Sequence, residues 1–121
     1  MGNQIGSDLQ KEKEDILHAQ ELIAGKWNIL ILYYLSKRPY RFNELQRQLP
    51  SMTQATLSKQ LKLLEARGMI SRKKYAQIPP KVEYSPGPVG KLFLPLIDSL
   101  VKFGAEAKNV LPKEEEPVPV E

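Results

Sequence analysis

Residues 41–67, RFNELQRQLPSMTQATLSKQLKLLEAR, predict two short amphipathic helices separated by a break at Pro50. In the second helix Leu57, Leu61 and Leu64 recur at the three- and four-residue spacing of one helical face, which predicts that they point into a core. The opposite face carries small, hydroxylic or basic side chains and no acidic one before the last turn. An outward face of this kind suits the major groove of DNA, where side chains meet base edges and phosphates.

The first helix of this pair has its own apolar face at Phe42, Leu45 and Leu49. Thr53 stands at the N-cap of the second helix, where a threonine hydroxyl accepts a hydrogen bond from the backbone. Gly68 follows the second helix directly, and glycine is the residue most often found just past a helix C-terminus. The segment is therefore expected to form a helix-turn-helix.

After the second helix the sequence alternates between apolar and polar residues, as β-strands do. Residues 69–75, MISRKKY, and residues 81–85, KVEYS, each fit one short strand. The loop that joins them contains Pro79 and Pro80, which restrict its backbone. A β-hairpin is expected across residues 69–85. Two helices followed by a basic hairpin is the order of a winged helix-turn-helix, so the predicted fold class is mainly α with a small β-hairpin.

Helices are also expected on the N-terminal side of this unit. Residues 8–24 carry a rough apolar stripe and Ser7 is suited to cap them, whereas residues 1–7 have no pattern and are expected to be loose. Residues 26–36, KWNILILYYLS, contain many residues that favour strands, but eleven residues is long for a strand and usual for a buried helix. We therefore predict a helix that is hidden on most faces, with Trp27 in the core.

The last helix is expected at residues 88–109, with Pro88 in its first turn. Its apolar residues form two adjacent rows, a stripe wider than one small domain needs to bury. Pro95 removes a backbone donor and is expected to kink this helix. Residues 112–121, PKEEEPVPVE, are acidic and rich in proline, so we expect a disordered tail after a single domain at residues 1–111.

Charge is unevenly distributed along the 121 residues, whose net charge is +4. Residues 26–91 contain thirteen basic residues and three acidic ones, a net of +10, and the two ends together carry −6. A basic centre between acidic ends indicates a localised site for a polyanion such as nucleic acid. No apolar run has the length of a membrane span and the N-terminus has no signal-peptide core, so we expect a cytoplasmic protein.

Enzymatic chemistry finds little support in this composition. The sequence contains no cysteine, which excludes disulfides, thiolate catalysis and the usual zinc frameworks. The one histidine, His18, has no visible partner to orient it, so a surface or dimer-contact role is favoured over that of a general base. The sequence has no phosphate-binding glycine motif and no cluster of His, Cys and carboxylates. We expect no enzyme, no catalytic residue, no cofactor and no metal.

Five segments carry a resemblance to a known family. They are Gly25-Lys26-Trp27 with the ILIL run that follows, RFNEL at residues 41–45, LKLLE at residues 61–65 with Gly68, PPKVEYS at residues 79–85, and Gly90-Lys91-Leu92 with Pro95. In this order they resemble the HxlR-type winged helix-turn-helix transcriptional regulators, relatives of the MarR group. The resemblance covers residues 22–104, which is most of the chain.

The resemblance implies a homodimer, built from the N- and C-terminal helices at residues 8–24 and 88–109, that binds an inverted repeat in double-stranded DNA. Many members of this family carry a cysteine that senses oxidants or electrophiles. This chain has none, so a thiol switch does not transfer to it. The apolar side chains expected at the dimer interface are Leu9, Ile16, Leu92, Phe93, Leu96, Ile97, Leu100 and Val101.

DNA contacts are expected from both the helix pair and the hairpin. Glutamine can pair with adenine edges, and hydroxyl and amino groups can serve phosphates or bases. The candidates on the helix pair are Arg41, Asn43, Thr53, Gln54, Thr56, Ser58, Lys59 and Lys62, and those on the hairpin are Lys73, Lys74 and Lys81.

Two other functions remain open at this point. The same scaffold can serve as a protein-interaction module that does not read DNA. A regulator of this kind can also bind a small hydrophobic effector at the dimer interface, beside Trp27, Tyr33, Tyr34 or Phe103. RNA binding is disfavoured because the sequence offers no aromatic stacking platform.

Overall fold

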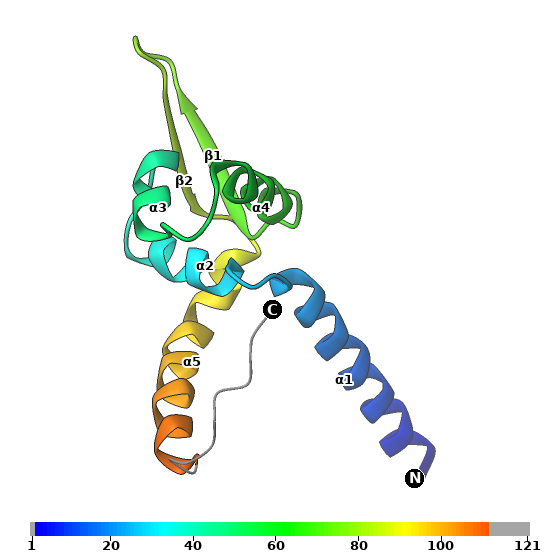
Figure 1. Ribbon diagram of the computed structural model, residues 1–121. Helices are drawn as coiled ribbons and strands as arrows, with labels where there is room; N and C mark the ends of the chain where they lie inside the picture. Colours follow the sequence, from blue (N-terminus) through cyan, green and yellow to red (C-terminus); the bar gives the residue numbers. More distant parts are fainter. Residues whose placement is uncertain (1, 112–121) are drawn as a thin grey trace.

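A computed structural model of the chain describes residues 2–111, which form five helices and one two-stranded antiparallel sheet; the tail expected at residues 112–121 lies outside them. Helices α2, α3 and α4 make a central unit, from which the hairpin projects at one end and α1 and α5 at the other (Figure 1). The predicted fold class is confirmed. The elements are α1 (Gly2–Ile23), α2 (Asn28–Lys37), α3 (Phe42–Gln48), α4 (Gln54–Ala66), β1 (Ile70–Tyr75), β2 (Lys81–Pro86) and α5 (Gly90–Val110).

Helix α2 lies at the centre of the core. Its side chains Ile31, Leu32 and Leu35 are at most 2% exposed, and the helix packs against both β2 and α5. The expectation of a buried helix rather than a strand in this segment is confirmed. Trp27, which precedes the helix, is half-buried and packs against the edge of the core.

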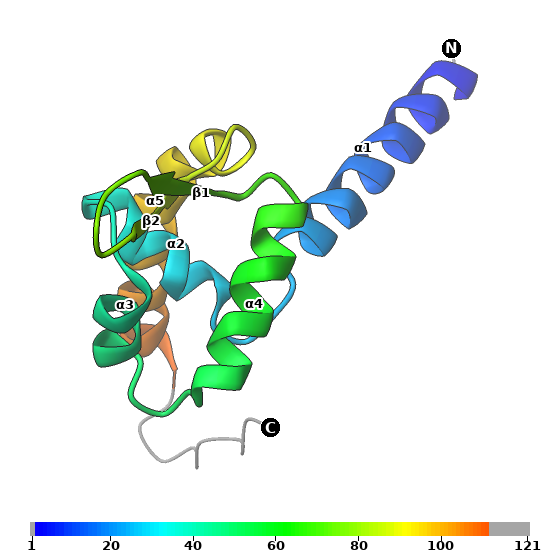
Figure 2. The ribbon, with the colours of Figure 1, turned by 90° about the horizontal axis from the view of Figure 1, so that it is seen from above.

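Helices α3 and α4 are joined by a short turn (Figure 2). Side chains hold this turn from both ends. The side-chain amide of Gln46 in α3 donates a hydrogen bond to the carbonyl oxygen of Met52 at 2.5 Å. The hydroxyl of Thr53 accepts one from the backbone N–H of Thr56 at 3.0 Å, which confirms the predicted N-cap. The side chains of α4 that face the core are the predicted ones, Leu57, Leu61 and Leu64.

The predicted hairpin is also confirmed, because β1 and β2 pair over their full length. Residues 76–80 form its tip, which lies at the opposite end of the molecule from the free ends of α1 and α5 (Figure 1). At the base, the N–H of Tyr40 donates to the carbonyl of Tyr84 at 3.0 Å and the N–H of Tyr84 donates back at 2.8 Å. This bridge ties the hairpin to the segment between α2 and α3.

Two helix starts differ from expectation. Helix α1 begins at Gly2, so Ser7 lies within the helix and does not cap it. No proline interrupts residues 2–7, and extending a helix costs little once it has nucleated. Helix α5 begins at Gly90, two residues after Pro88, and the backbone N–H groups at its start donate to another part of the chain.

That other part is the backbone that follows α4. Gly68, with a φ of +75°, ends α4 as predicted, and its carbonyl accepts hydrogen bonds from Val89 at 2.9 Å and Gly90 at 3.3 Å. The N–H of Gly87 donates to the carbonyl of Met69 at 3.0 Å. A Cβ atom on Gly90 would overlap the Met69 carbonyl, so only glycine allows this approach. The end of α4, the base of the hairpin and the start of α5 are thereby fixed to one another.

Gly90→Ala is expected to destabilise the fold by about 3 kcal/mol, because its Cβ meets backbone that cannot move without breaking the crossing. Thermal unfolding should show a melting temperature lower by roughly 10 °C or more. Gly104→Ala is the matched control. Gly104 also lies in α5, but a Cβ atom added to it would meet no other atom within 4 Å. The control should raise stability by about 0.5–1 kcal/mol. Equal melting temperatures for the two variants would contradict the role given to Gly90.

Candidate nucleic-acid interface

The buried side chains of α4 determine which of its side chains point outward. Because three leucines of α4 face the core, the side chains opposite them point to solvent. The first turn of the helix contains no acidic residue, and Ser58 is half-buried at the margin of the face. The exposed side chains of this face are Gln54, Ala55, Thr56, Lys59 and Lys62.

The first turn of α4 is positioned by two hydroxyl groups. Besides its capping bond, the Thr53 hydroxyl donates to the hydroxyl of Thr56 at 2.8 Å. An N-cap of this kind contributes about 1 kcal/mol to helix stability. Thr53 and Thr56 therefore fix the end of the helix beside the exposed Gln54, and the N-terminal turns of a recognition helix are the ones that meet base edges.

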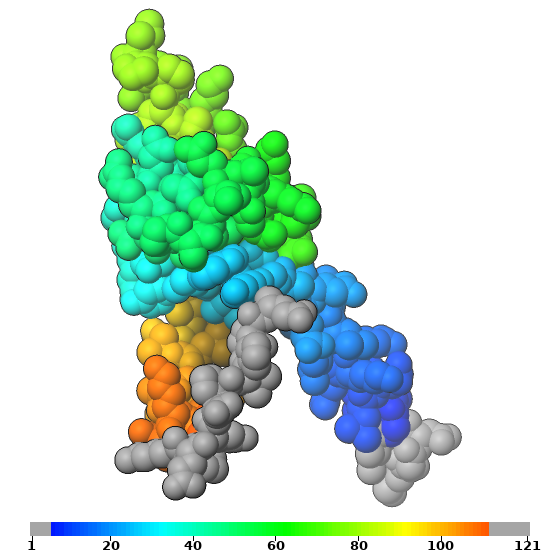
Figure 3. Space-filling view, viewed as in Figure 1, coloured from blue at the N-terminus to red at the C-terminus, as the bar shows by residue number. Residues whose placement is uncertain are grey.

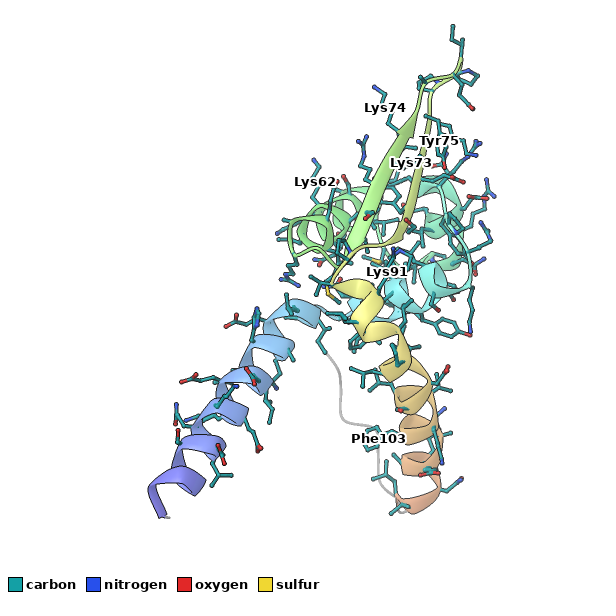
Figure 4. The ribbon with its side chains drawn as sticks, turned by 180° about the vertical axis from the view of Figure 1, so that it is seen from behind. Lys62, Lys73, Lys74, Tyr75, Lys91 and Phe103 are labelled. Atoms are coloured by element: carbon teal, nitrogen blue, oxygen red, sulfur yellow. The ribbon has the colours of Figure 1, made fainter. Side chains whose placement is uncertain are left out.

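The two faces of the hairpin carry different basic residues. In an antiparallel pair, opposite residues share a face and the face alternates along each strand. Arg72 and Lys74 of β1 therefore share one face, and Lys73 lies on the other. Figure 4 shows Lys74 directed to the side of the hairpin on which Lys62 of α4 lies.

A shallow groove joins this face of the hairpin to α4. Ser58 and Lys62 of α4 and Arg72 and Tyr84 of the hairpin are among the residues that line its volume of about 370 Å³. Arg72 is exposed here and was missing from the contacts chosen from the sequence. The strand alternation that pairs it with Lys74 was the signal available to find it. The groove connects α4 to the hairpin, and its lining combines the basic Lys62 and Arg72 with the acidic Glu65.

On the opposite face of the hairpin, the basic side chains contact neighbouring residues of the hairpin itself. The Nζ atoms of Lys73 and Lys81 each lie 4.8 Å from the ring centroid of Tyr75, within the range of a cation–π contact. Lys81 Nζ also lies 3.5 Å from Glu83 Oε2. Lys81 is half-buried between these groups and is less available to a ligand than the exposed Lys73.

Arg41 and Asn43 are exposed at the start of α3, next to an acidic residue that is held in place. The backbone N–H of Arg41 donates to Glu44 Oε1 at 2.8 Å, and Arg38 Nη1 lies 3.5 Å from Glu44 Oε2. The hydrogen bond from the Arg41 backbone is the main cause that holds the pKa of Glu44 below its ordinary value; desolvation opposes it, and the neighbouring charge of Arg38 adds to the lowering. The one carboxylate near this end of α3 is thus engaged with its own neighbours.

A second exposed surface is apolar and lies on α1 and α5. Leu22 and Ile23 of α1 and Leu92, Leu96 and Phe103 of α5 are among the residues that line a groove of about 530 Å³ between the two helices. Figure 4 shows Phe103 directed toward the space between α1 and α5.

Most side chains assigned to the dimer interface lie on open parts of this surface. Phe93 is half-buried against the core. Ile97 is only 3% exposed, because the inner row of α5 packs against α2, so it belongs to the core of its own chain and not to the open face. The exposed members of the predicted set are Leu9, Ile16, Leu92, Leu96, Leu100 and Val101.

Within residues 2–111, no group of three or more His, Cys, Asp or Glu side chains is placed to hold a metal ion. In the same part of the chain no helix combines the length and apolar character that crossing a bilayer requires. The single histidine, His18, is exposed on α1.

Comparison with known proteins adds a family match, two similar regulators and a similar solved structure. Residues 22–111 match the model of the HxlR-like helix-turn-helix family. The HTH-type transcriptional regulator BH0655 of Halalkalibacterium halodurans is 47% identical over 89 residues, which are 73% of this chain and 79% of that protein. The HTH-type transcriptional regulator YkvN of Bacillus subtilis is 46% identical over 85 residues, 70% of this chain and 72% of that protein. The solved structure of the redox regulator HypR in its reduced form superposes with a TM-score of 0.75 at 36% identity, covering 79% of this chain and 95% of that chain.

The lowered pKa of Glu44 predicts an acid-sensitive contribution to stability. A carboxyl whose pKa is lower in the folded state stabilises the fold above its unfolded pKa, here about 4.5, and loses that effect as the pH falls through the folded value. Urea unfolding between about pH 6 and pH 3 should therefore show a steeper loss of stability for the native chain than for Glu44→Gln. Parallel curves for the two proteins would contradict the assignment.

Proposed function

This chain belongs to the HxlR-like helix-turn-helix family, and we propose that it acts as a homodimer that recognises an inverted repeat in double-stranded DNA. Like its relatives, it is a helix-turn-helix transcriptional regulator and not an enzyme. The observation that carries the proposal is the exposed face of α4 with Lys59 and Lys62, which a groove connects to the exposed Arg72 of the hairpin. We place its activity in the cytoplasm, where the chromosome lies in the bacteria that carry these relatives.

In this proposal α4 enters the major groove. Gln54 offers an amide that can pair with an adenine edge, and Lys59 and Lys62 reach phosphates or guanine. Thr53 and Thr56 hold the first turn and the phosphate beside it. The remaining candidates would contact the DNA backbone on either side: Arg41, Asn43 and Ser58 from the helix pair and Arg72, Lys73, Lys74 and Lys81 from the hairpin.

The dimer is supported by the apolar surface that α1 and α5 leave open. An apolar area of this extent usually marks an interface, and a second copy offers the same helices as the complementary surface. The Leu9, Ile16, Leu92 and Leu96 side chains of one protomer would pack against those helices of its partner. A two-fold dimer presents two copies of α4, so its operator has two inverted half-sites with centres about 34 Å apart.

Of the two other possible functions, one is disfavoured and one remains a candidate. A module that does not read DNA is disfavoured, because the relatives are named as HTH-type transcriptional regulators. A hydrophobic effector remains a second candidate, favoured by a groove of about 480 Å³ between α2 and α5 that Lys26, Tyr33 and Ile97 help to line. HypR is named a redox regulator, but this chain contains no cysteine, so we do not extend a thiol switch to it.

Lys59→Ala combined with Lys62→Ala should weaken binding to an operator selected from a random duplex pool by roughly tenfold or more. Removing two phosphate contacts from each protomer should also lower the slope of log affinity against log salt by about 1.8 per half-site, or about 3.6 for the dimer. The double variant Lys102→Ala with Lys108→Ala removes the same charge from α5 and should leave the slope unchanged. Fluorescence anisotropy over a range of salt concentrations measures both quantities. The proposal would be contradicted if the native chain did not bind duplex DNA, or bound it with an affinity independent of salt.

Leu96→Glu should convert the dimer into a folded monomer, because Leu96 is 53% exposed in the single chain and a charge there would be buried between two copies. Lys102→Glu places the same charge on a polar position of the same helix and should leave the dimer intact. Sedimentation equilibrium gives the mass, and circular dichroism checks the fold. A dimeric Leu96→Glu variant would exclude this surface as the interface.

A further inference from the structure

The outward face of α4 has a shallow hollow at its centre. The hollow has a volume of about 410 Å³, and the residues that line it are Ala55, Ser58, Lys59, Lys62 and Leu63. It forms because the short side chains of Ala55 and Ser58 lie beside the long ones of the two lysines. In Figure 3 helix α4 (green) lies at the surface, between the hairpin and α1.

The floor of this hollow is apolar, although its rim is basic. Lys59 and Lys62 can serve phosphates, but the methyl group of Ala55 neither donates nor accepts a hydrogen bond. Ala55 is exposed, so its methyl group meets whatever group enters the hollow. In the major groove of unmodified DNA, the apolar group on the base edges is the C5-methyl of thymine, and alanine is one of the side chains that contact it.

The place of Ala55 along α4 suits contact with a base. It is the second residue of the helix, and the N-terminal turns of a recognition helix are those that reach base edges. The hydroxyls of Thr53 and Thr56, 2.8 Å apart, hold this turn. Leu63, the other apolar residue of the hollow, lies about 12 Å farther along the helix axis. We therefore assign the base contact to Ala55.

The size of the Ala55 side chain favours the same contact. A longer side chain at this position would fill the hollow and hold α4 away from the floor of the major groove. The aliphatic stems of Lys59 and Lys62 stand beside the hollow, and stems of this kind cover apolar groups while the charged ends stay in water. A thymine methyl group in the hollow would therefore be shielded from water on several sides.

We propose that Ala55 contacts the C5-methyl group of one thymine in each half-site and makes that T·A pair a determinant of operator specificity. This inference rests on the proposed function, because it needs α4 in the major groove. It supplies sequence information that the phosphate contacts of Lys59 and Lys62 do not carry. Gln54, the preceding residue, can pair with an adenine edge, so the first two residues of α4 both favour A·T pairs.

Replacing thymine by uracil tests the contact, because uracil pairs with adenine in the same way and lacks only the C5-methyl group. Each thymine of an operator selected from a random duplex pool is replaced in turn, and affinity is measured by fluorescence anisotropy. At one position in each half-site, affinity should fall about fourfold, and about fifteenfold when both half-sites are changed. The slope of log affinity against log salt should stay unchanged, because no phosphate contact is lost.

Ala55→Gly removes the methyl group on the protein side. This variant should bind the thymine and uracil operators with nearly equal affinity. Ala66→Gly is the matched control, because Ala66 is also exposed on α4 but lies in its last turn. The control has the same loss of helix propensity and should keep the full preference for thymine. Circular dichroism checks that both variants are folded.

The possible outcomes separate the two proposals. A native chain without salt-dependent affinity for duplex DNA overturns the proposed function. If the native chain binds its operator but no thymine position responds to uracil, the thymine contact alone is overturned. The contact is also overturned if Ala55→Gly keeps the preference for thymine. Loss of that preference in Leu63→Ala but not in Ala55→Gly would assign the methyl group to Leu63 instead.

Discussion

The crossing of the backbone at Gly68 and Gly90 is the constraint on which the rest of the arrangement depends. The Gly68 carbonyl accepts hydrogen bonds from the N–H groups of Val89 and Gly90, and the absence of a side chain on Gly90 lets the two segments meet. Helix α4 ends on one side of this crossing and α5 begins on the other. The angle between the face that reads DNA and the helix that carries the apolar surface is therefore set by main-chain hydrogen bonds, which hold it more rigidly than side-chain packing alone.

Helix α1 is tied to the same end of α4 by side chains. The guanidinium of Arg67, the C-cap of α4, donates to the carbonyl of Ala24 at 2.9 Å, just past the end of α1. The buried side chain of Asn28 at the start of α2 donates to the same carbonyl at 2.6 Å. Both helices of the apolar surface thus meet the last turn of α4. In a two-fold dimer the distance between the two copies of α4 would follow from these ties, and that distance sets the spacing of half-sites that can be read.

The sequence predicted what local periodicity and capping determine, and it failed where distant segments meet. Leu57, Leu61 and Thr53 lie where their spacing and chemistry place them, because helix faces and caps depend on neighbours within one or two turns. The start of α5 depends on a carbonyl more than twenty residues earlier in the chain, which no local pattern reveals. Ile97 and Leu96 belong to one apolar stripe in the sequence, and only the contact with α2 separates a core residue from an exposed one. The DNA contacts and the dimer stay proposals.

These ties also limit how the protein can be switched. With no cysteine in the sequence, a disulfide cannot lock two elements together, whereas a bound ligand can favour one arrangement of them over another. A ligand in the groove between α2 and α5 would touch Tyr33 on α2 and Ile97 on α5, two helices that pack against each other. Such a ligand acts on DNA binding only if it has different affinities for two positions of α5. The main-chain crossing at Gly68 resists that movement, whereas the side-chain bonds of Arg67 to the end of α1 can exchange with water. A change in the direction of α1 would therefore break fewer main-chain hydrogen bonds than a change in the direction of α5.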